Sequence, residues 1–382
     1  MPRVTLPSYR RRLPATSYRH AGNFTVLMLP ESALVLRRSI GAALFFLLVS
    51  FSCLLLFGNA DYSRFASSNP LVHVSTVFPS NDSVSNEYSL ENILNEASMK
   101  DKTVILTTLN EAWAAPNSII DLFLESFRIG DRTRRLLNHL VIVALDPKAF
   151  IRCQAIHPFC YLLASEAVDF REEAFFMTPH YLKMMWRRID FLRSVLELGY
   201  NFVFTDADIM WFRDPFPRFH RDADFQIACD HFTGSFDDVE NRPNGGFNFV
   251  KSNNRSIEFY KFWYSSQETY PGYHDQDVLN FIKVDPFITD LGLKMKFLDT
   301  ANFGGLCEPS KDLNKVCTMH ANCCYGMDSK LHDLRIMLQD WKYYLTLAPS
   351  LKRLSIISWR VPQKCSLDSL NTGSPEKSAQ EN

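Results

Sequence analysis

The sequence has no excess of charge of either sign, with 41 lysines and arginines against 42 aspartates and glutamates. This balance argues against a nucleic-acid-binding protein, which would carry a basic face or stripe. Glycine is scarce, at 14 residues, and no short period recurs, which argues against collagen-like and solenoid folds. Apolar residues are not lacking: 46% of the 382 residues are hydrophobic and 22% are charged, which excludes extensive disorder and allows one large α/β domain or two average ones.

Long hydrophobic runs are also rare, and the one that stands out covers residues 39–58, 20 residues without a charge. That length crosses the hydrocarbon core of a bilayer. Residues 1–38 carry seven arginines, no lysine and one acid, so the positive-inside rule predicts a cytoplasmic tail, a signal-anchor and a translocated remainder. Two alternatives are a cleaved signal peptide, for which 38 preceding residues are too many, and a core helix, which is rarely apolar on every face.

Eight of the nine cysteines follow the predicted anchor, on the lumenal side, where disulfides form. Four bridges are compatible with this number, and the sequence leaves their pairing open. Asn81-Asp-Ser and Asn254-Arg-Ser are glycosylation acceptors on the same side. Asn23-Phe-Thr fits the pattern too but lies in the predicted cytoplasmic tail, so a sugar on Asn23 would contradict this topology.

The remainder of the chain divides by composition into three parts. Residues 59–90 are rich in serine and asparagine, which is typical of a stem. The polar composition of residues 366–382 predicts a disordered tail. Between them, residues 91–365 form the predicted lumenal domain.

Strand and helix patterns alternate in this domain. Residues 102–109 and 139–145 are β-branched, apolar runs that suit buried strands, and residues 116–138 carry helical spacing between them. Such alternation predicts an α/β fold with a mainly parallel sheet flanked by helices.

The clearest predicted element is a helix that begins after Thr178, a residue suited to capping, and stops at Gly199. Its apolar stripe repeats at helical spacing. A strand at 201–205 follows and runs directly into Asp206 and Asp208.

Asp-x-Asp pairs occur three times, and one of them follows a buried strand. Ligands of open α/β sheets bind beyond the carboxyl ends of strands. Two carboxylates at such an end suit a hard cation, Mn²⁺ or Mg²⁺, which can neutralise the charge of a departing diphosphate. The alternative for Asp206 and Asp208, the pair after the strand, is a turn or cap pair. Asp222 and Asp224 are expected on a solvated loop. The three pairs are Asp206/Asp208, Asp222/Asp224 and Asp275/Asp277.

The segment FTDADIMWFRDPF, residues 204–216, resembles the metal-binding signature of nucleotide-diphospho-sugar transferases. Similar motifs follow in the same order at NGGFNF (244–249), HDQDVLN (274–280) and TMHAN (318–322), so that the resemblance covers roughly residues 100–345. Taken together they resemble the plant members of glycosyltransferase family 77. The resemblance implies a GT-A fold and a single-pass type II protein of the Golgi membrane.

The implied activity is transfer of xylose, arabinose or galactose from a nucleotide diphosphate, expected to be a UDP-sugar, with retention at the anomeric carbon. The implied acceptor is a cell-wall polysaccharide or a hydroxyproline-rich glycoprotein. Neither the sugar nor the acceptor is selected by any motif in the sequence.

The resemblance implies that His320 joins Asp206 and Asp208 on the metal, with Mn²⁺ expected and Mg²⁺ as the alternative. His320 precedes Gly326 and Lys330, similar to the family's His, Gly and Lys segment but with different spacing. A competing interpretation is a zinc cluster, whose adjacent cysteines do not fit the usual ligand spacing. That cluster would comprise Cys317, His320, Cys323 and Cys324.

Asp275 and Gln276 resemble the segment that faces the anomeric carbon, and we expect them to be catalytic. The acid would hold sugar hydroxyls and the amide would stabilise an oxocarbenium-like centre. The alternative is a helix N-terminus with acids in its first turn. Asn244, Gly245 and Gly246 would let the backbone approach the donor, since glycine tolerates conformations that other residues avoid.

Four further positions are expected to bind the donor. The resemblance implies that a basic residue on the helix before the Asp-x-Asp strand reaches the nucleotide or sugar, and Lys183 and Arg187 lie one turn apart there. Their alternative is a solvated face. Thr107 and Asn110, at the end of the first strand, are in the usual place for contacts to base and ribose.

Two other functions compete with a transferase. A metal-dependent, phosphatase-like lumenal hydrolase also has a strand followed by Asp-x-Asp, with a nucleophilic aspartate, but there the motif tends to end the first strand. Here about 100 residues of the chain's predicted domain, with at least two strands, precede it. The other alternative is a catalytically inactive lumenal binding partner with the same fold.

Overall fold

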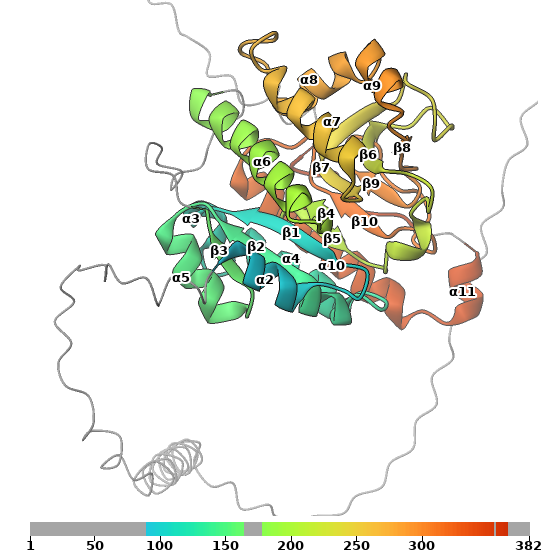
Figure 1. The fold of residues 1–382 in the computed structure, drawn as a ribbon. Coiled ribbons are helices and arrows are strands. Elements are labelled where there is room, and N and C mark those ends of the chain that lie inside the picture. The colour runs from blue at the N-terminus through green and yellow to red at the C-terminus, as the bar shows by residue number, and fades with distance from the viewer. Residues whose placement is uncertain (1–88, 164–177, 355–356, 366–382) are drawn as a thin grey trace, which may run out of the picture. The chain divides into compact units, whose positions relative to one another are not determined.

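The computed structural model describes residues 89–163, 178–354 and 357–365 (Figure 1). The predicted cytoplasmic tail, the anchor at 39–58, most of the stem and the C-terminal tail lie outside these residues. Within the described ranges, no helix combines the length and hydropathy needed to cross a bilayer.

A seven-stranded sheet forms the centre of the fold, in the order β3-β2-β1-β4-β7-β6-β8 (Figure 1). Its first four strands are parallel, β7 is antiparallel to both β4 and β6, and β8 is parallel to β6. The predicted α/β fold with a mainly parallel sheet is therefore confirmed, and the two antiparallel pairings of β7 make the sheet mixed. The strands are β1 (Thr103–Leu109), β2 (Leu140–Ala144), β3 (Cys160–Leu162), β4 (Asn201–Thr205), β6 (Phe225–His231), β7 (Arg242–Val250) and β8 (Met295–Phe297).

A second sheet of three short strands has β10 (Thr318–His320) at its centre. It pairs antiparallel with β5 (Ile209–Trp211) and parallel with β9 (Phe303–Gly305). Because β5 follows β4 in the chain, this sheet begins where the central strand ends.

Helices cover both faces of the central sheet, as Figure 1 shows. They are α2 (Leu90–Ala97), α3 (Glu111–Ala114), α4 (Ile119–Ile129), α5 (Pro147–Ile156), α6 (Pro179–Glu197), α7 (Asn254–Ser265), α8 (Asp275–Ile282), α9 (Pro286–Leu291), α10 (Met327–Thr346) and α11 (Pro349–Arg353). The segment with helical spacing at 116–138 is split between α4 and a 3₁₀ helix at Arg134–His139. Gly130 ends α4, and a Cβ there would lie 2.5 Å from the Trp211 carbonyl oxygen.

The apolar run of β1 is explained by its position between two cores. Ile105 and Leu109 belong to the core that α4 and α10 cover, whereas Val104 and Leu106 belong to the core that α6 and α7 cover. Successive strand residues point to opposite faces, so a strand buried on both sides is apolar throughout.

Helix α6 follows the sequence prediction closely. The Thr178 side chain accepts a hydrogen bond from the Tyr181 backbone N–H at 3.3 Å, and Pro179 occupies the first turn. Gly199 lies just beyond the helix with φ 83, which favours glycine. Strand β4 begins shortly after this helix and ends at Thr205, immediately before the two aspartates.

Candidate functional site

Strand pairing brings the predicted metal ligands together at the carboxyl end of β4. The backbone N–H of Asp206 donates to the carbonyl oxygen of Gly246 on β7 at 2.7 Å. Asp208 immediately precedes β5, and the antiparallel register of β10 places His320 opposite Ile209. The sheet therefore positions His320 beside an aspartate more than 100 residues earlier in the chain.

Asp206, Asp208 and His320 each offer one ligand atom, and these atoms all lie within 4.8 Å of one another. Nε2 of His320 is 3.2 Å from Oδ1 of Asp208 and 3.9 Å from Oδ2 of Asp206. That Asp208 oxygen is buried without a hydrogen-bond partner among the described residues. Two carboxylates, one of them with this unpartnered buried oxygen, and an imidazole fit a divalent cation such as Mn²⁺ or Mg²⁺.

Gly246 is required by the closeness of this cluster. A Cβ at this position would lie 2.6 Å from Oδ2 of Asp206 and 2.6 Å from Cε1 of His320, closer than real contacts allow. Gly245 is less crowded, since its Cβ would lie 3.3 Å from both Arg188 and Asp275. Gly246, which the sequence predicts beside the donor, thus leaves room for the side chains of Asp206 and His320 to approach one another.

Arg188 on α6 links the two carboxylate sites and was missed in the sequence. It donates to Asp206 at 3.0 Å and to Asp275 at 2.6 Å, and its side chain is only 6% exposed. The predicted basic residues of this helix, Lys183 and Arg187, are both exposed. Arg188 lies on the buried face of the helix. A charged residue at a buried position requires partners of opposite charge, and this is the sequence signal that could have identified Arg188.

The charges around the aspartates shift their pKa values in different directions. Burial raises the pKa of Asp275, but the charge and the hydrogen bond of Arg188, together with the nearby His274, outweigh it and lower this pKa to about 2. Burial likewise opposes ionisation of Asp208, yet the charges of Lys330 and His320 bring its pKa below the ordinary value. For Asp206, burial and the neighbouring Asp208 charge together exceed the effect of Arg188, so its pKa is raised.

Lys330, in the first turn of α10, is the second cation of the site. Its Nζ donates to Oδ2 of Asp208 at 2.5 Å and to the carbonyl oxygen of Ala321 at 2.8 Å. It also lies 5.8 Å from the ring centroid of Trp113. Lys330 thus holds one carboxylate oxygen of Asp208 while the other faces His320.

Asp230, at the carboxyl-end side of β6, orients three side-chain amides. Its carboxylate accepts hydrogen bonds from Asn244 at 2.8 Å, Asn322 at 2.7 Å and Gln276 at 2.9 Å. The Gln276 carbonyl oxygen accepts from the backbone N–H of Gly245 at 3.0 Å, so both ends of this amide are held. No spacing in the sequence marks Asp230, because its partners come from three separate elements.

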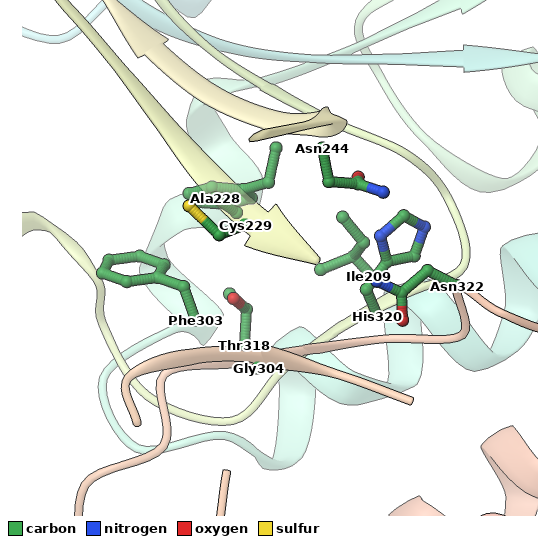
Figure 2. Close-up of a pocket in the computed structure, with 10 residues that line it drawn as sticks. Ile209, Ala228, Cys229, Asn244, Phe303, Gly304, Thr318, His320 and Asn322 are labelled. Atoms are coloured by element: carbon green, nitrogen blue, oxygen red, sulfur yellow. The ribbon is translucent and has the colours of Figure 1, made fainter. Parts of the chain in front are cut away.

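A pocket lies beside the cluster, and Figure 2 shows its lining. Asn244, His320 and Asn322 give it polar groups, and Cys229 and Phe303 are among its apolar ones. The candidate metal site and the Asp230 network therefore border one space.

The two residues predicted at the end of β1 have distinct environments. Thr107 is fully buried, and its hydroxyl has no hydrogen-bond partner among the described residues. Asn110 caps α3 by accepting a hydrogen bond from the backbone N–H of Trp113 at 3.1 Å. The amide oxygen of Asn110 thus has a structural role that its sequence position did not indicate.

The second Asp-x-Asp pair is not the solvated pair that the sequence suggested. Asp222 is exposed, but Asp224 is buried. It accepts hydrogen bonds from Arg255 and Asn253 at 2.9 Å and from the backbone N–H of Lys294 at 3.0 Å. These contacts make Asp224 a structural carboxylate that joins the start of α7 to the segment just before β8.

The zinc-cluster interpretation is wrong, because two of its cysteines are in disulfides. Of the described cysteines, six form three bridges, and Cys229 and Cys317 are buried free thiols. The bridges are Cys153–Cys160, Cys307–Cys323 and Cys324–Cys365.

Comparison with known proteins agrees with the site. Residues 135–334 match the nucleotide-diphospho-sugar transferase family. Two uncharacterized Arabidopsis thaliana proteins are similar to this chain. At4g15970 is 52% identical over 277 residues, which cover 72% of this chain and 73% of that protein. At1g28695 is 39% identical over 253 residues, which cover 65% of this chain and 76% of that protein. The beta-arabinofuranosyltransferase RAY1 of the same plant is 26% identical over 181 residues, 44% of this chain and 31% of RAY1. The chain belongs to the nucleotide-diphospho-sugar transferase family.

Proposed function

We propose that this protein is a metal-dependent glycosyltransferase that moves xylose, arabinose or galactose from a UDP-sugar to a cell-wall polysaccharide or hydroxyproline-rich glycoprotein. The observation that carries the proposal is the convergence of Asp206, Asp208 and His320 beyond the carboxyl end of β4. The similarity to an arabinosyltransferase supports the sugar class. Retention at the anomeric carbon is proposed with it.

Asp206, Asp208 and His320 would hold the cation, Mn²⁺ or alternatively Mg²⁺. When bound, the cation supplies positive charge against that of the departing diphosphate. The chain keeps these ligands in place: Lys330 and Arg188 each hold one of the two carboxylates by a charged hydrogen bond. The ligand set is therefore preorganised before any donor arrives.

Gln276 is the residue that we place beside the donor sugar. It is partly exposed, next to Gly245, and both ends of its amide are held by hydrogen bonds. Asp275 is 1% exposed, so its carboxylate acts in this structure through Arg188. We therefore assign Asp275 a positioning role, whereas the sequence suggested direct contact with the sugar.

The proposed location is the Golgi membrane, with residues 39–58 as the anchor and the catalytic domain in the lumen. Seven arginines before the anchor support this orientation, and three disulfides suit an oxidising compartment. Asn254, the predicted lumenal glycosylation acceptor, is exposed at the start of α7.

Binding of UDP to the full-length protein in detergent tests the proposal without an acceptor. Titration calorimetry with Mn²⁺ present should detect binding, and excess chelator should abolish it. Replacement of His320 by alanine should weaken the metal-dependent binding. Absence of UDP binding to the wild-type protein in Mn²⁺ would instead favour the inactive lumenal partner.

A further inference from the structure

The loop at residues 321–326 connects two groups that meet on Asp208. His320 ends β10 just before the loop, 3.2 Å from Oδ1 of Asp208. Lys330 lies in the first turn of α10 just after it, 2.5 Å from Oδ2. The backbone N–H of Ala321 also donates to the Asp208 carbonyl oxygen at 3.1 Å. The shape of this loop therefore determines where both side chains reach the aspartate.

This shape is one that a chain rarely adopts without restraint. Cys323 has φ 49 and Gly326 has φ 80, so the backbone enters the left-handed region or its vicinity twice within four residues. Glycine adopts such conformations freely, but for other residues they are uncommon and persist when the surroundings hold them.

Two adjacent disulfides attach the loop to two different parts of the fold. Cys323 is bonded to Cys307, which follows β9, and the backbone N–H of Cys307 donates to Oδ1 of Asn322 at 3.2 Å. A Cβ on Gly305 would lie 2.3 Å from that Asn322 oxygen, so the two segments are in close contact.

The second bridge joins the loop to the end of the described chain. Cys324 is bonded to Cys365, whose backbone N–H donates at 3.1 Å to the carboxylate of Asp333. Asp333 is a fully buried residue of α10 and also accepts hydrogen bonds from the backbone N–H groups of Gln363 and Lys364. The bridge thus links the loop to a segment that α10 already holds firmly.

We propose that the disulfides Cys307–Cys323 and Cys324–Cys365 position the candidate metal site, by holding His320 and Lys330 on Asp208. This inference rests on the proposed metal-dependent function. The third bridge, Cys153–Cys160, joins α5 to β3, the strand at one edge of the central sheet, and it provides a matched control.

Three double variants of the full-length protein test the inference: C307S/C323S, C324S/C365S and the control C153S/C160S. Mn²⁺ affinity is measured by calorimetry with the metal alone, and the thermal unfolding midpoint is measured in parallel. All three variants should unfold at lower temperature. The two loop variants should lose about tenfold or more in Mn²⁺ affinity, because substitutions that remove the support of metal ligands have effects of this size. The control variant should bind Mn²⁺ as wild type does. Loop variants that bind Mn²⁺ as wild type does would overturn the inference.

If the loop variants do not fold, the wild-type protein is reduced stepwise with a phosphine. Each bridge then yields two thiols, and the phosphine becomes its oxide with an oxygen atom from water. Alkylation and mass spectrometry identify the opened bridges. Affinity that falls as the loop bridges open supports the inference, and affinity unchanged after their opening contradicts it. Failure of the untreated wild-type protein to bind Mn²⁺ would contradict the proposed function itself.

Discussion

Lys330 donates a 2.5 Å hydrogen bond to Asp208, a residue 122 positions earlier in the chain. The lysine charge is among the causes that lower the pKa of this aspartate despite its burial. The contact therefore keeps a candidate metal ligand ionised while its other oxygen faces His320.

Replacement of Lys330 by methionine should move the acidic limb of the activity profile to higher pH. Without the lysine the pKa of Asp208 rises, so the ionised carboxylate is lost sooner as pH falls. The measurement is UDP-sugar turnover against pH. Lys342 lies on the same helix and pairs on the surface with Glu125, so Lys342→Met is the matched control. Identical profiles for K330M and K342M would contradict the assigned role.

Replacement of Arg188 by methionine should destabilise the protein by about 3–5 kcal/mol, because it leaves Asp275 charged, buried and unpaired. Denaturant unfolding measures this change. The double variant R188M/D275N should recover much of the stability but no transferase activity. Arg193→Met, which disrupts partly exposed ion pairs on the same helix, should cost about 1 kcal/mol or less. A similar loss in R188M and R193M would show that the buried pairing is not important.

The ion pair of Asp275 should make stability depend on pH in the acidic range. Its pKa is lowered in the folded protein from 3.8 to about 2, so it stabilises the fold above pH 4 and this contribution is lost between about pH 4 and pH 2. The contribution is about 2 kcal/mol. Unfolding free energies measured from pH 5 to pH 2 should fall more steeply for wild type than for Asp275→Asn. Parallel curves would refute this account of the residue.

A methyl group at Gly246 should disrupt the metal cluster more than one at Gly245. The Cβ of Gly246→Ala would lie 2.6 Å from Asp206 and His320 atoms, whereas that of Gly245→Ala would lie 3.3 Å from its neighbours. We expect G246A to lose about tenfold or more in Mn²⁺ affinity, comparable to loss of ligand support. Calorimetric titration of both variants checks the order. Equal Mn²⁺ affinities of G246A and G245A would contradict this prediction, because they would show that the cluster accommodates a methyl group at Gly246.

Local patterns predicted the parts of the fold and site that depend on neighbours in the chain. The apolar runs at β1, β2 and β4 mark strands buried on both faces, and α6 has a cap, a stripe and a stop at the expected residues. Asp206 and Asp208 were identified because they follow such a strand.

Other site residues depend on pairing between distant segments. His320 was placed with the aspartates only through resemblance to a family, since the β5–β10 register is not visible in spacing. Asp230 has no local signal, because the amides that it orients come from β7, α8 and the loop after β10. Arg188 has a local signal, because it is a charged residue on the buried, apolar face of α6. A buried charge requires paired partners, so its position predicts carboxylates nearby.

The most direct test of the central claim is release of UDP by the full-length protein from UDP-xylose, UDP-arabinose and UDP-galactose. Each donor is supplied with Mn²⁺ or with chelator, together with a mixture of cell-wall polysaccharides and hydroxyproline-rich glycoproteins. We expect acceptor-stimulated release from one donor, abolished by chelator and by Asp208→Asn, with the folding of this variant verified by its thermal unfolding. Release that persists in chelator, or in the Asp208→Asn variant, would contradict it.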